Sequence, residues 1–295
     1  ELDAGPGRAR QGRVDGPGPA QDEAAQVGGV QAVGVLVRVD ALQDGVGVDA
    51  SRQGQLDDVA GAGPVGVEGV DGGLDLGLRV VDTAEMYGSG ASEELVGEAI
   101  AGRRDDVFLV SKVLPSNASA SGVRRALEAS LYRLNTDRLD LYLYHWRGHH
   151  RLEETVEALQ AAVDDGLIGA WGVSNFDPAD MDDLADLGVT PATNQILYNL
   201  LRRGPEYDLL PLMRERGVDL MAYSPLEQGR LFQGQPGKLL SEIAAEAGTT
   251  PAALALAWAV REPGSIAIPR TSSPERMEEN ASALQVTLTP EILRD

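Results

Sequence analysis

The sequence predicts an α/β fold, a (β/α)8 TIM barrel, and two observations support this. From Leu74 onward, short apolar runs alternate with amphipathic segments, and most successive runs begin near 25 to 30 residues apart. That spacing is typical of consecutive βα units, which build either an open doubly wound sheet or a closed barrel. Polar residues recur where the runs end, which is how barrels present their chemistry. The expected strands are Leu78–Val81, Val107–Ser111, Leu139–Tyr144, Ala170–Val173, Thr193–Ile196, Leu220–Tyr223 and Ser265–Ile268.

Helix-start signals separate these strands. Asp177, Thr250 and Ser273 each precede a proline, so that a capping side chain is followed by the residue favoured at the first helical position. The helices are expected to begin near Ser92, Ser119, Leu152, Asp177, Pro205, Leu239, Pro251 and Ser273. Only seven strands are found where a barrel needs eight, so we expect the first strand and first helix to be abnormal or missing.

Residues 1–72 differ from the rest of the chain. They contain no lysine, phenylalanine, tyrosine or tryptophan and are rich in glycine, valine and aspartate, which cannot build a dense core. The best strand candidate there is Val33–Val39. We expect residues 1–72 to be a low-complexity head, mistranslated or disordered, and residues 73–295 to be a barrel. We expect that barrel to be truncated at its C-terminal end, because only one helical turn follows the cap at Thr289.

The composition limits the classes of function. The chain has no cysteine, which excludes disulfides and thiolate chemistry. The formal charge of −21 argues against nucleic acid or an anionic membrane as a partner. Neither a membrane-spanning apolar run nor a signal-peptide pattern is found. We therefore expect a soluble cytoplasmic protein.

Four polar side chains would meet at one mouth of the barrel: Asp82, Tyr87, Lys112 and His145. A tyrosine is a poor proton donor near neutral pH, and a neighbouring ammonium favours its ionised form. A carboxylate would keep the ammonium charged, and a histidine could orient a carbonyl oxygen. Lys112 is one of only two lysines among 25 basic residues, which suggests a need for a compact ammonium. This set suits the protonation of a carbonyl oxygen.

A series of motifs, all in family order, makes residues 74–295 resemble an aldo-keto reductase, with most similarity to bacterial diketogulonate and methylglyoxal reductases. The motifs begin with Asp82-Thr83-Ala84, Tyr87-Gly88, Ser111-Lys112 and His145-Trp146. They continue with Gly172-Val173-Ser174-Asn175-Phe176, Asn194-Gln195, Tyr223-Ser224-Pro225-Leu226, Ile268-Pro269-Arg270-Thr271, Arg276 and Glu279-Asn280.

The resemblance implies NADPH-dependent reduction of a small aldehyde or ketone, by a protein that is commonly a monomer. Tyr87 would donate the proton, Lys112 and Asp82 would tune it, His145 would orient the substrate, and Trp146 would border it. The residues implied to contact the cofactor are, for the nicotinamide, Ser174, Asn175, Gln195 and Tyr223; for the pyrophosphate, Ser224 and Leu226; and for the adenosine 2′-phosphate and adenine, Arg270, Thr271, Arg276, Glu279 and Asn280.

Other interpretations remain open. A nicotinamide-binding regulatory subunit would have the same fold, and a damaged reading frame would give an inactive product. Gly88-Ser89-Gly90 is interpreted as a turn rather than a phosphate loop, because two glutamates follow it at the start of a helix. His149 and His150 lack a matched carboxylate spacing and are interpreted as part of a polar loop, so we expect no metal site.

Overall fold

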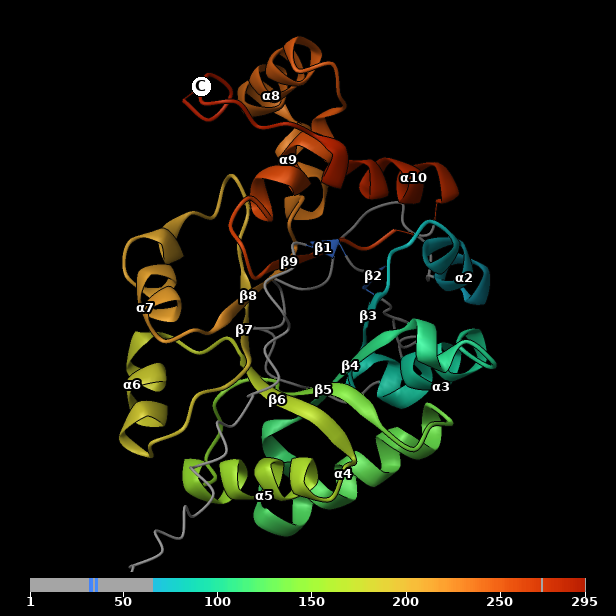
Figure 1. Ribbon diagram of the computed structural model, residues 1–295, viewed down its shortest axis with the longest axis vertical. Helices are drawn as coiled ribbons and strands as arrows, with labels where there is room; N and C mark the ends of the chain where they lie inside the picture. The colour runs from blue at the N-terminus through green and yellow to red at the C-terminus, as the bar shows by residue number, and fades with distance from the viewer. Residues whose placement is uncertain (1–31, 34, 37–65, 272, 295) are drawn as a thin grey trace, which may run out of the picture.

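The computed structural model describes residues 32–33, 35–36, 66–271 and 273–294. Its strands form one parallel sheet in the order β1-β9-β8-β7-β6-β5-β4-β3-β2. The two ends of this sheet are the short strands β1 (Ala32–Val33) and β2 (Val35–Leu36), so the strands form a nearly closed ring (Figure 1). The other strands are β3 (Val80–Asp82), β4 (Phe108–Val113), β5 (Leu139–Tyr144), β6 (Ile168–Ser174), β7 (Thr193–Leu197), β8 (Asp219–Tyr223) and β9 (Ser265–Ile268).

The barrel predicted from the sequence is confirmed, and β3 to β9 correspond to its seven expected strands. The place of the eighth lies between β9 and β3. There Ala32 pairs with Ile266 and Val35 pairs with Val81. The two short strands overlap the candidate Val33–Val39, of which residues 34 and 37–39 lie outside the described residues. An abnormal first strand therefore agrees with the structure.

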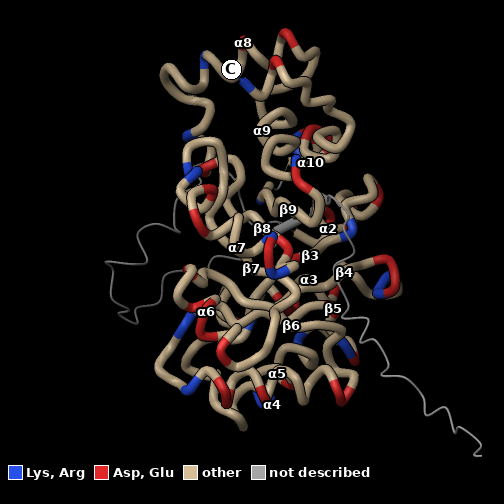
Figure 2. The backbone as a smooth tube through the Cα atoms, turned by 60° about the vertical axis from the view of Figure 1, so that its left-hand side comes forward, with Lys and Arg blue, Asp and Glu red and all other residues tan. Residues whose placement is uncertain are grey.

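The helices surround this ring, and in Figures 1 and 2 α8 and α9 lie at one end of the molecule while α4 and α5 lie at the other. Figure 2 also shows acidic and basic residues spread over the outer helices. The helices are α2 (Val67–Asp75), α3 (Ala91–Ala99), α4 (Ala120–Arg133), α5 (Leu152–Asp164), α6 (Pro178–Asp186), α7 (Leu209–Glu215), α8 (Gly234–Glu246), α9 (Pro251–Ala259) and α10 (Pro274–Ser282).

The helix before β3, which we expected to be abnormal or missing, is present as α2. Three of its nine residues are glycines, the poorest helix formers after proline. Val70 and Leu74 nevertheless bury their side chains in the core, so packing rather than propensity maintains this helix. The helix also spans residue 72, where we placed the boundary between head and barrel. That division remains a prediction.

Most capping signals act as expected. The side chains of Ser119, Asp177, Thr250 and Ser273 each accept a hydrogen bond from a backbone N–H in the first turn of their helix. Each satisfies a donor that the helix itself leaves without a partner.

The helix start expected near Ser92 is one residue from the observed start of α3 at Ala91, whereas the starts expected near Pro205 and Leu239 were inaccurate. A 3-10 turn occupies Gly204–Glu206, and α7 begins only at Leu209. The N-cap of α3 is Gly90, with φ 100°, and Ser92 lies buried inside the first turn. Helix α8 begins at Gly234 rather than near Leu239. A Cβ on Gly237 would lie 2.2 Å from the backbone carbon of Phe232. The close approach of Gly237 to the backbone of Phe232 therefore requires glycine inside the helix, although the glycines of this segment indicate a loop in the sequence.

Two layers of the hydrophobic core are built on the strands, and a separate small cluster lies between α8 and α9. A small cluster inside the ring includes Val110, Leu141, Leu143, Met221 and Ile266. A larger cluster lies between the strands and the helices that cover them. Side chains that alternate along each strand supply the two layers. The interior is therefore filled, and chemistry is confined to the ends of the strands.

None of the helices in the described part of the chain is long and apolar enough to cross a membrane.

Candidate active site

An ion pair lies at the centre of the site, where β3 and β4 end. Lys112 Nζ lies 2.6 Å from Asp82 Oδ2, and both side chains are fully buried. The same ammonium donates a hydrogen bond of 2.7 Å to the carbonyl oxygen of Thr83. Asp82 ends β3, and its register partner in β4 is Val110, two residues before Lys112. Parallel pairing thus brings the two charges together across 30 residues of sequence.

The surroundings of Lys112 favour its charged form. Burial by itself acts to lower the pKa of this lysine, but the carboxylate of Asp82 and a hydrogen bond with Tyr87 more than offset burial, so the pKa is raised. Asp82 receives a second donor, because Gln195 Nε2 lies 2.8 Å from its Oδ1. Burial raises the pKa of the Asp82 carboxyl, and the Lys112 ammonium and the Gln195 amide act against that rise by favouring the carboxylate.

Tyr87 and His145 lie next to this pair. The Lys112 ammonium lies 5.0 Å from the centroid of the Tyr87 ring. The rings of Tyr87 and His145 meet edge to face, with centroids 5.9 Å apart. The backbone N–H of His145 donates to the carbonyl oxygen of Val113, 3.1 Å away, which places the imidazole directly after β5. The structure therefore brings together all four residues expected to perform the chemistry.

Trp146 borders this group. Its ring centroid lies 4.7 Å from that of His145, and the residue is 37% exposed. Trp146 thus lies beside the proposed catalytic group, and its contact with a substrate stays a prediction.

A second polar group joins the ends of β6, β7 and β8. Ser174 Oγ donates to the Gln195 carbonyl oxygen at 2.9 Å, and Asn175 Nδ2 donates to the His145 carbonyl oxygen at 3.1 Å. Tyr223 Oη donates to Asn175 Oδ1 at 2.9 Å. Burial raises the pKa of Tyr223 to about 12, so the phenol remains neutral at physiological pH. All four residues were expected to surround a nicotinamide, and the structure places them beside one another.

The loop after β8 is held by a charged contact that sequence analysis missed. Glu227 is buried, and its carboxylate accepts hydrogen bonds from Asn199 Nδ2 at 2.7 Å and Arg202 Nε at 3.0 Å. Ser224 and Glu227 have φ of 48° each, a region that residues with side chains rarely adopt. The expected pyrophosphate contacts, Ser224 and Leu226, thus lie on a constrained loop.

The segment from β9 into α10 contains the expected phosphate contacts. Arg270 is half-buried, Thr271 is buried, and Arg276 is exposed in the first turn of α10. Ser273 caps this helix by accepting from the Arg276 N–H. Farther along α10, Asn280 is buried and Glu279 is half-buried. Two guanidinium groups beside a helix N-terminus suit an anionic ligand.

Two features of the site could not be found from local sequence. The expected contact of Gln195 with a carboxamide stays a prediction, and the structure adds a hydrogen bond from its amide nitrogen to Asp82, 113 residues away. Glu85 was not expected to have a role, yet it accepts hydrogen bonds from the segment after β4. Neither contact has a short-range signal. The Glu85 contact joins segments that follow the neighbouring strands β3 and β4, whereas β7 and β3 are not neighbours and Gln195 reaches Asp82 across the ring.

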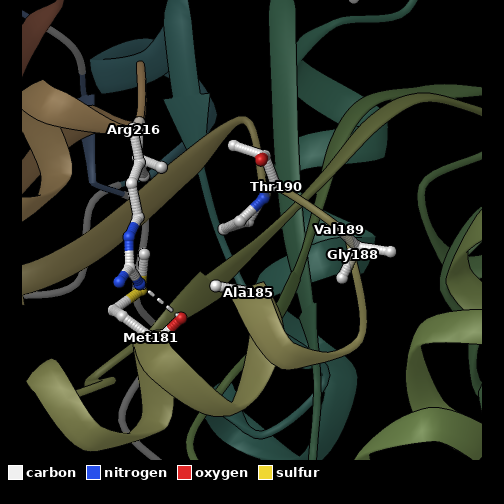
Figure 3. Close-up of a pocket in the computed structure, with 8 residues that line it drawn as sticks. Met181, Ala185, Gly188, Val189, Thr190 and Arg216 are labelled. Carbon is white, nitrogen blue, oxygen red and sulfur yellow. Dashed lines mark hydrogen bonds between the residues drawn. The ribbon is translucent and has the colours of Figure 1, made fainter.

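A pocket of about 300 Å³ lies elsewhere, beside α6 and the segment that leads into β7 (Figure 3). Met181, Thr190 and Arg216 are among its lining residues, and Arg216 Nη1 donates to the Met181 carbonyl oxygen at 2.7 Å. Thr190 precedes β7, so the pocket lies at the N-terminal ends of the strands, opposite Asp82 and Lys112. In barrels of this kind that end serves stability rather than chemistry.

A sequence model of the aldo/keto reductase family matches residues 67–294. The chain belongs to this family. The aldo/keto reductase is 48% identical over 221 residues to "Methylglyoxal reductase YeaE" of Escherichia coli, a match that covers 74% of this chain and 78% of that protein. It is also 33% identical over 228 residues to "Glyoxal reductase" of Bacillus subtilis, covering 76% of this chain and 79% of that protein.

A solved structure resembles the fold of this aldo/keto reductase. It is an aldo-keto reductase from Klebsiella pneumoniae in complex with NADPH, with a TM-score of 0.76 and 43% sequence identity. The match covers 89% of this chain and 88% of that one. The chain is thus an oxidoreductase by family, as the motifs predicted.

Proposed function

We propose that this aldo/keto reductase reduces a small aldehyde or ketone to an alcohol, using NADPH as reductant and Tyr87 as proton donor. The observation that supports this most strongly is the buried Lys112–Asp82 pair in contact with Tyr87, beside His145. The names of two relatives, methylglyoxal reductase and glyoxal reductase, point to small carbonyl compounds as substrates.

The donor set fits the proposed cofactor. Arg270 and Arg276 supply two positive charges around the start of α10 for a phosphate. Ser174, Asn175 and Tyr223 form a hydrogen-bonding group beside the catalytic residues, as a carboxamide and its ring would need. The related Klebsiella pneumoniae structure contains NADPH. When bound, NADPH supplies the hydride that the carbonyl carbon accepts.

The protein's own residues deliver the proton. The Tyr87 hydroxyl donates to the carbonyl oxygen as negative charge develops there, and the product is an alcohol. The Lys112 ammonium stabilises the phenolate that remains, in a buried setting where an electrostatic interaction is strong. Asp82 balances the ammonium while the hydroxyl is still neutral. His145, edge to face with Tyr87, orients the carbonyl oxygen, and water restores the proton to Tyr87.

The test is the consumption of NADPH with methylglyoxal by the wild-type chain and by Tyr87→Phe. The variant should bind NADPH as tightly as wild type while its kcat falls by roughly 10²- to 10⁴-fold, the usual contribution of a general acid. Tyr132→Phe is the matched control, because Tyr132 is 87% exposed on α4. A Tyr87→Phe variant with wild-type kcat would show that another group delivers the proton.

We also propose that the protein is a cytoplasmic monomer. Size-exclusion chromatography with light scattering would measure its oligomeric state.

A further inference from the structure

Glu85 connects two of the loops that carry the catalytic residues. It lies in the loop between Asp82 and Tyr87. Its Oε1 accepts a hydrogen bond of 2.6 Å from the backbone N–H of Leu114 and one of 3.0 Å from Asn117 Nδ2. Its Oε2 lies 3.2 Å from the same Asn117 nitrogen. The loop after β3 is thereby fastened to the segment after β4.

The positions of these contacts in the chain are what make them relevant. Glu85 lies two residues before Tyr87, and Leu114 lies two residues after Lys112. Lys112 is fixed by β4 and by its bonds to Asp82 and Thr83. Tyr87 lies beyond the end of β3, where ladder hydrogen bonds no longer fix the backbone. The Glu85 side chain therefore fixes the tyrosine loop relative to the strand that carries the ammonium.

The same segment continues to the loop after His145. A Cβ on Gly148 would lie 2.6 Å from Pro115 Cβ and 2.9 Å from the Tyr144 hydroxyl. The Gly148 N–H donates to that hydroxyl at 2.8 Å. Because glycine allows this close approach, the loops that follow β3, β4 and β5 contact one another in order. A shift of the segment at Leu114 would disturb both Tyr87 and His145.

We propose that Glu85 is a positioning residue, which holds the Tyr87 hydroxyl at the correct place beside the Lys112 ammonium. The inference rests on the proposed reduction chemistry. The hydrogen bonds of the Glu85 carboxylate go to Leu114 and Asn117, whereas the residues proposed to bind NADPH lie on or directly after β6, β7 and β8 and in the segment from β9 into α10. Its loss should therefore affect proton delivery and leave cofactor binding unchanged.

Three variants separate geometry from charge. Glu85→Gln keeps an oxygen that can accept from Leu114 and Asn117 but removes the charge. Glu85→Asp keeps the charge but is one methylene shorter, and Glu85→Ala removes the acceptor. Glu94→Gln is the matched control, because Glu94 is exposed on α3. The measurements are kcat with methylglyoxal, the dissociation constant for NADPH, and the solvent deuterium isotope effect on kcat.

Glu85→Ala should lower kcat by roughly 10- to 100-fold, because a misplacement of about 1 Å in an active site costs that much. Its isotope effect should exceed that of wild type, since proton transfer becomes slower. Glu85→Asp should move in the same direction, whereas Glu85→Gln and Glu94→Gln should stay within about threefold of wild type. NADPH affinity should be unchanged throughout. If Glu85→Ala does not fold, the comparison of kcat between Glu85→Asp and Glu85→Gln tests the proposal.

The reverse order, with Glu85→Gln impaired and Glu85→Asp active, would show that charge rather than position matters and would overturn the proposal. Weaker NADPH binding in step with the loss of kcat would overturn it as well, because the role would then be general stability. A wild-type chain that binds NADPH but reduces no carbonyl would overturn the proposed function itself.

Discussion

Removing the Lys112 ammonium tests the centre of the site most directly. Lys112→Met keeps most of the unbranched side chain and deletes the charge that faces Asp82. Because both side chains are fully buried, the carboxylate would be left without its counter-ion. Breaking a buried pair in this way costs about 3–5 kcal/mol of the free energy of unfolding. For a domain of this size the melting temperature should fall by roughly 6–20 °C.

A second substitution separates stability from activity. In Asp82→Asn/Lys112→Met both partners are neutral, so neither leaves a buried charge. Replacing a whole buried pair is often close to neutral for stability. The double variant should therefore be more stable than the sum of the single variants predicts, with a coupling energy of about 2–3 kcal/mol. Its kcat should nevertheless remain at least roughly 100-fold below wild type, because no ammonium stabilises the Tyr87 phenolate.

The assay is denaturant unfolding of wild type, both single variants and the double variant at pH about 7, together with NADPH consumption. Lys238→Met is the control, since the second lysine of the chain is exposed on α8. A Lys112→Met variant that loses less than about 1 kcal/mol, the usual value of an exposed pair, would refute the buried ion pair. A double variant with wild-type kcat would refute the role of the ammonium.

Two further predictions concern the cofactor segment and the loop after β8. Arg276→Ala should weaken NADPH binding by roughly tenfold and leave NADH binding nearly unchanged, because the substitution removes one charge-assisted contact to the 2′-phosphate. Fluorescence titration with both cofactors measures the two affinities. An equal loss of affinity for NADPH and NADH would contradict the prediction. Burial opposes the ionisation of Glu227, but hydrogen bonds from Asn199 and Arg202 more than offset burial and lower its pKa below the usual 4.5. The ionised Glu227 therefore stabilises the fold above pH 4.5, and this stabilisation is lost as the pH falls through the pKa of Glu227 in the folded protein. Glu227→Gln should have a lower melting temperature than wild type near neutral pH, and its melting temperature should fall less on acidification. If the melting temperatures of the two proteins fall in parallel in acid, Glu227 is not the group responsible.

Local signals in the sequence were sufficient to predict most of the elements and to name most of the candidate site residues. Most strands from β3 to β9 are short and largely apolar, and polar side chains lie at or just after the ends of several of them, so the positions of Asp82, Lys112 and His145 could be predicted. Caps at Asp177, Thr250 and Ser273 depend on neighbours within one turn. Such features are encoded by residues a few positions apart, which is why they can be recognised without knowing the fold.

Glycine-dependent features were harder to predict. The early start of α8 depends on how closely Gly237 approaches the backbone of Phe232, and the start of α3 depends on the left-handed conformation of Gly90. Composition alone assigns the first residues of α8 to a loop, because glycine is a poor helix former. Tertiary packing overrides that preference.

By itself, the sequence determined the class of fold and the order of the strands along the chain, and it predicted Asp82, Tyr87, Lys112 and His145 as the candidate catalytic residues. Only the tertiary structure showed that residues 32–33 and 35–36 lie between β9 and β3, that Gln195 donates to Asp82, and that Glu85 fastens one loop to the next. The reason is physical. Propensities and caps depend on near neighbours, whereas a hydrogen bond between residues far apart in the chain exists only once the ring of strands has made them adjacent.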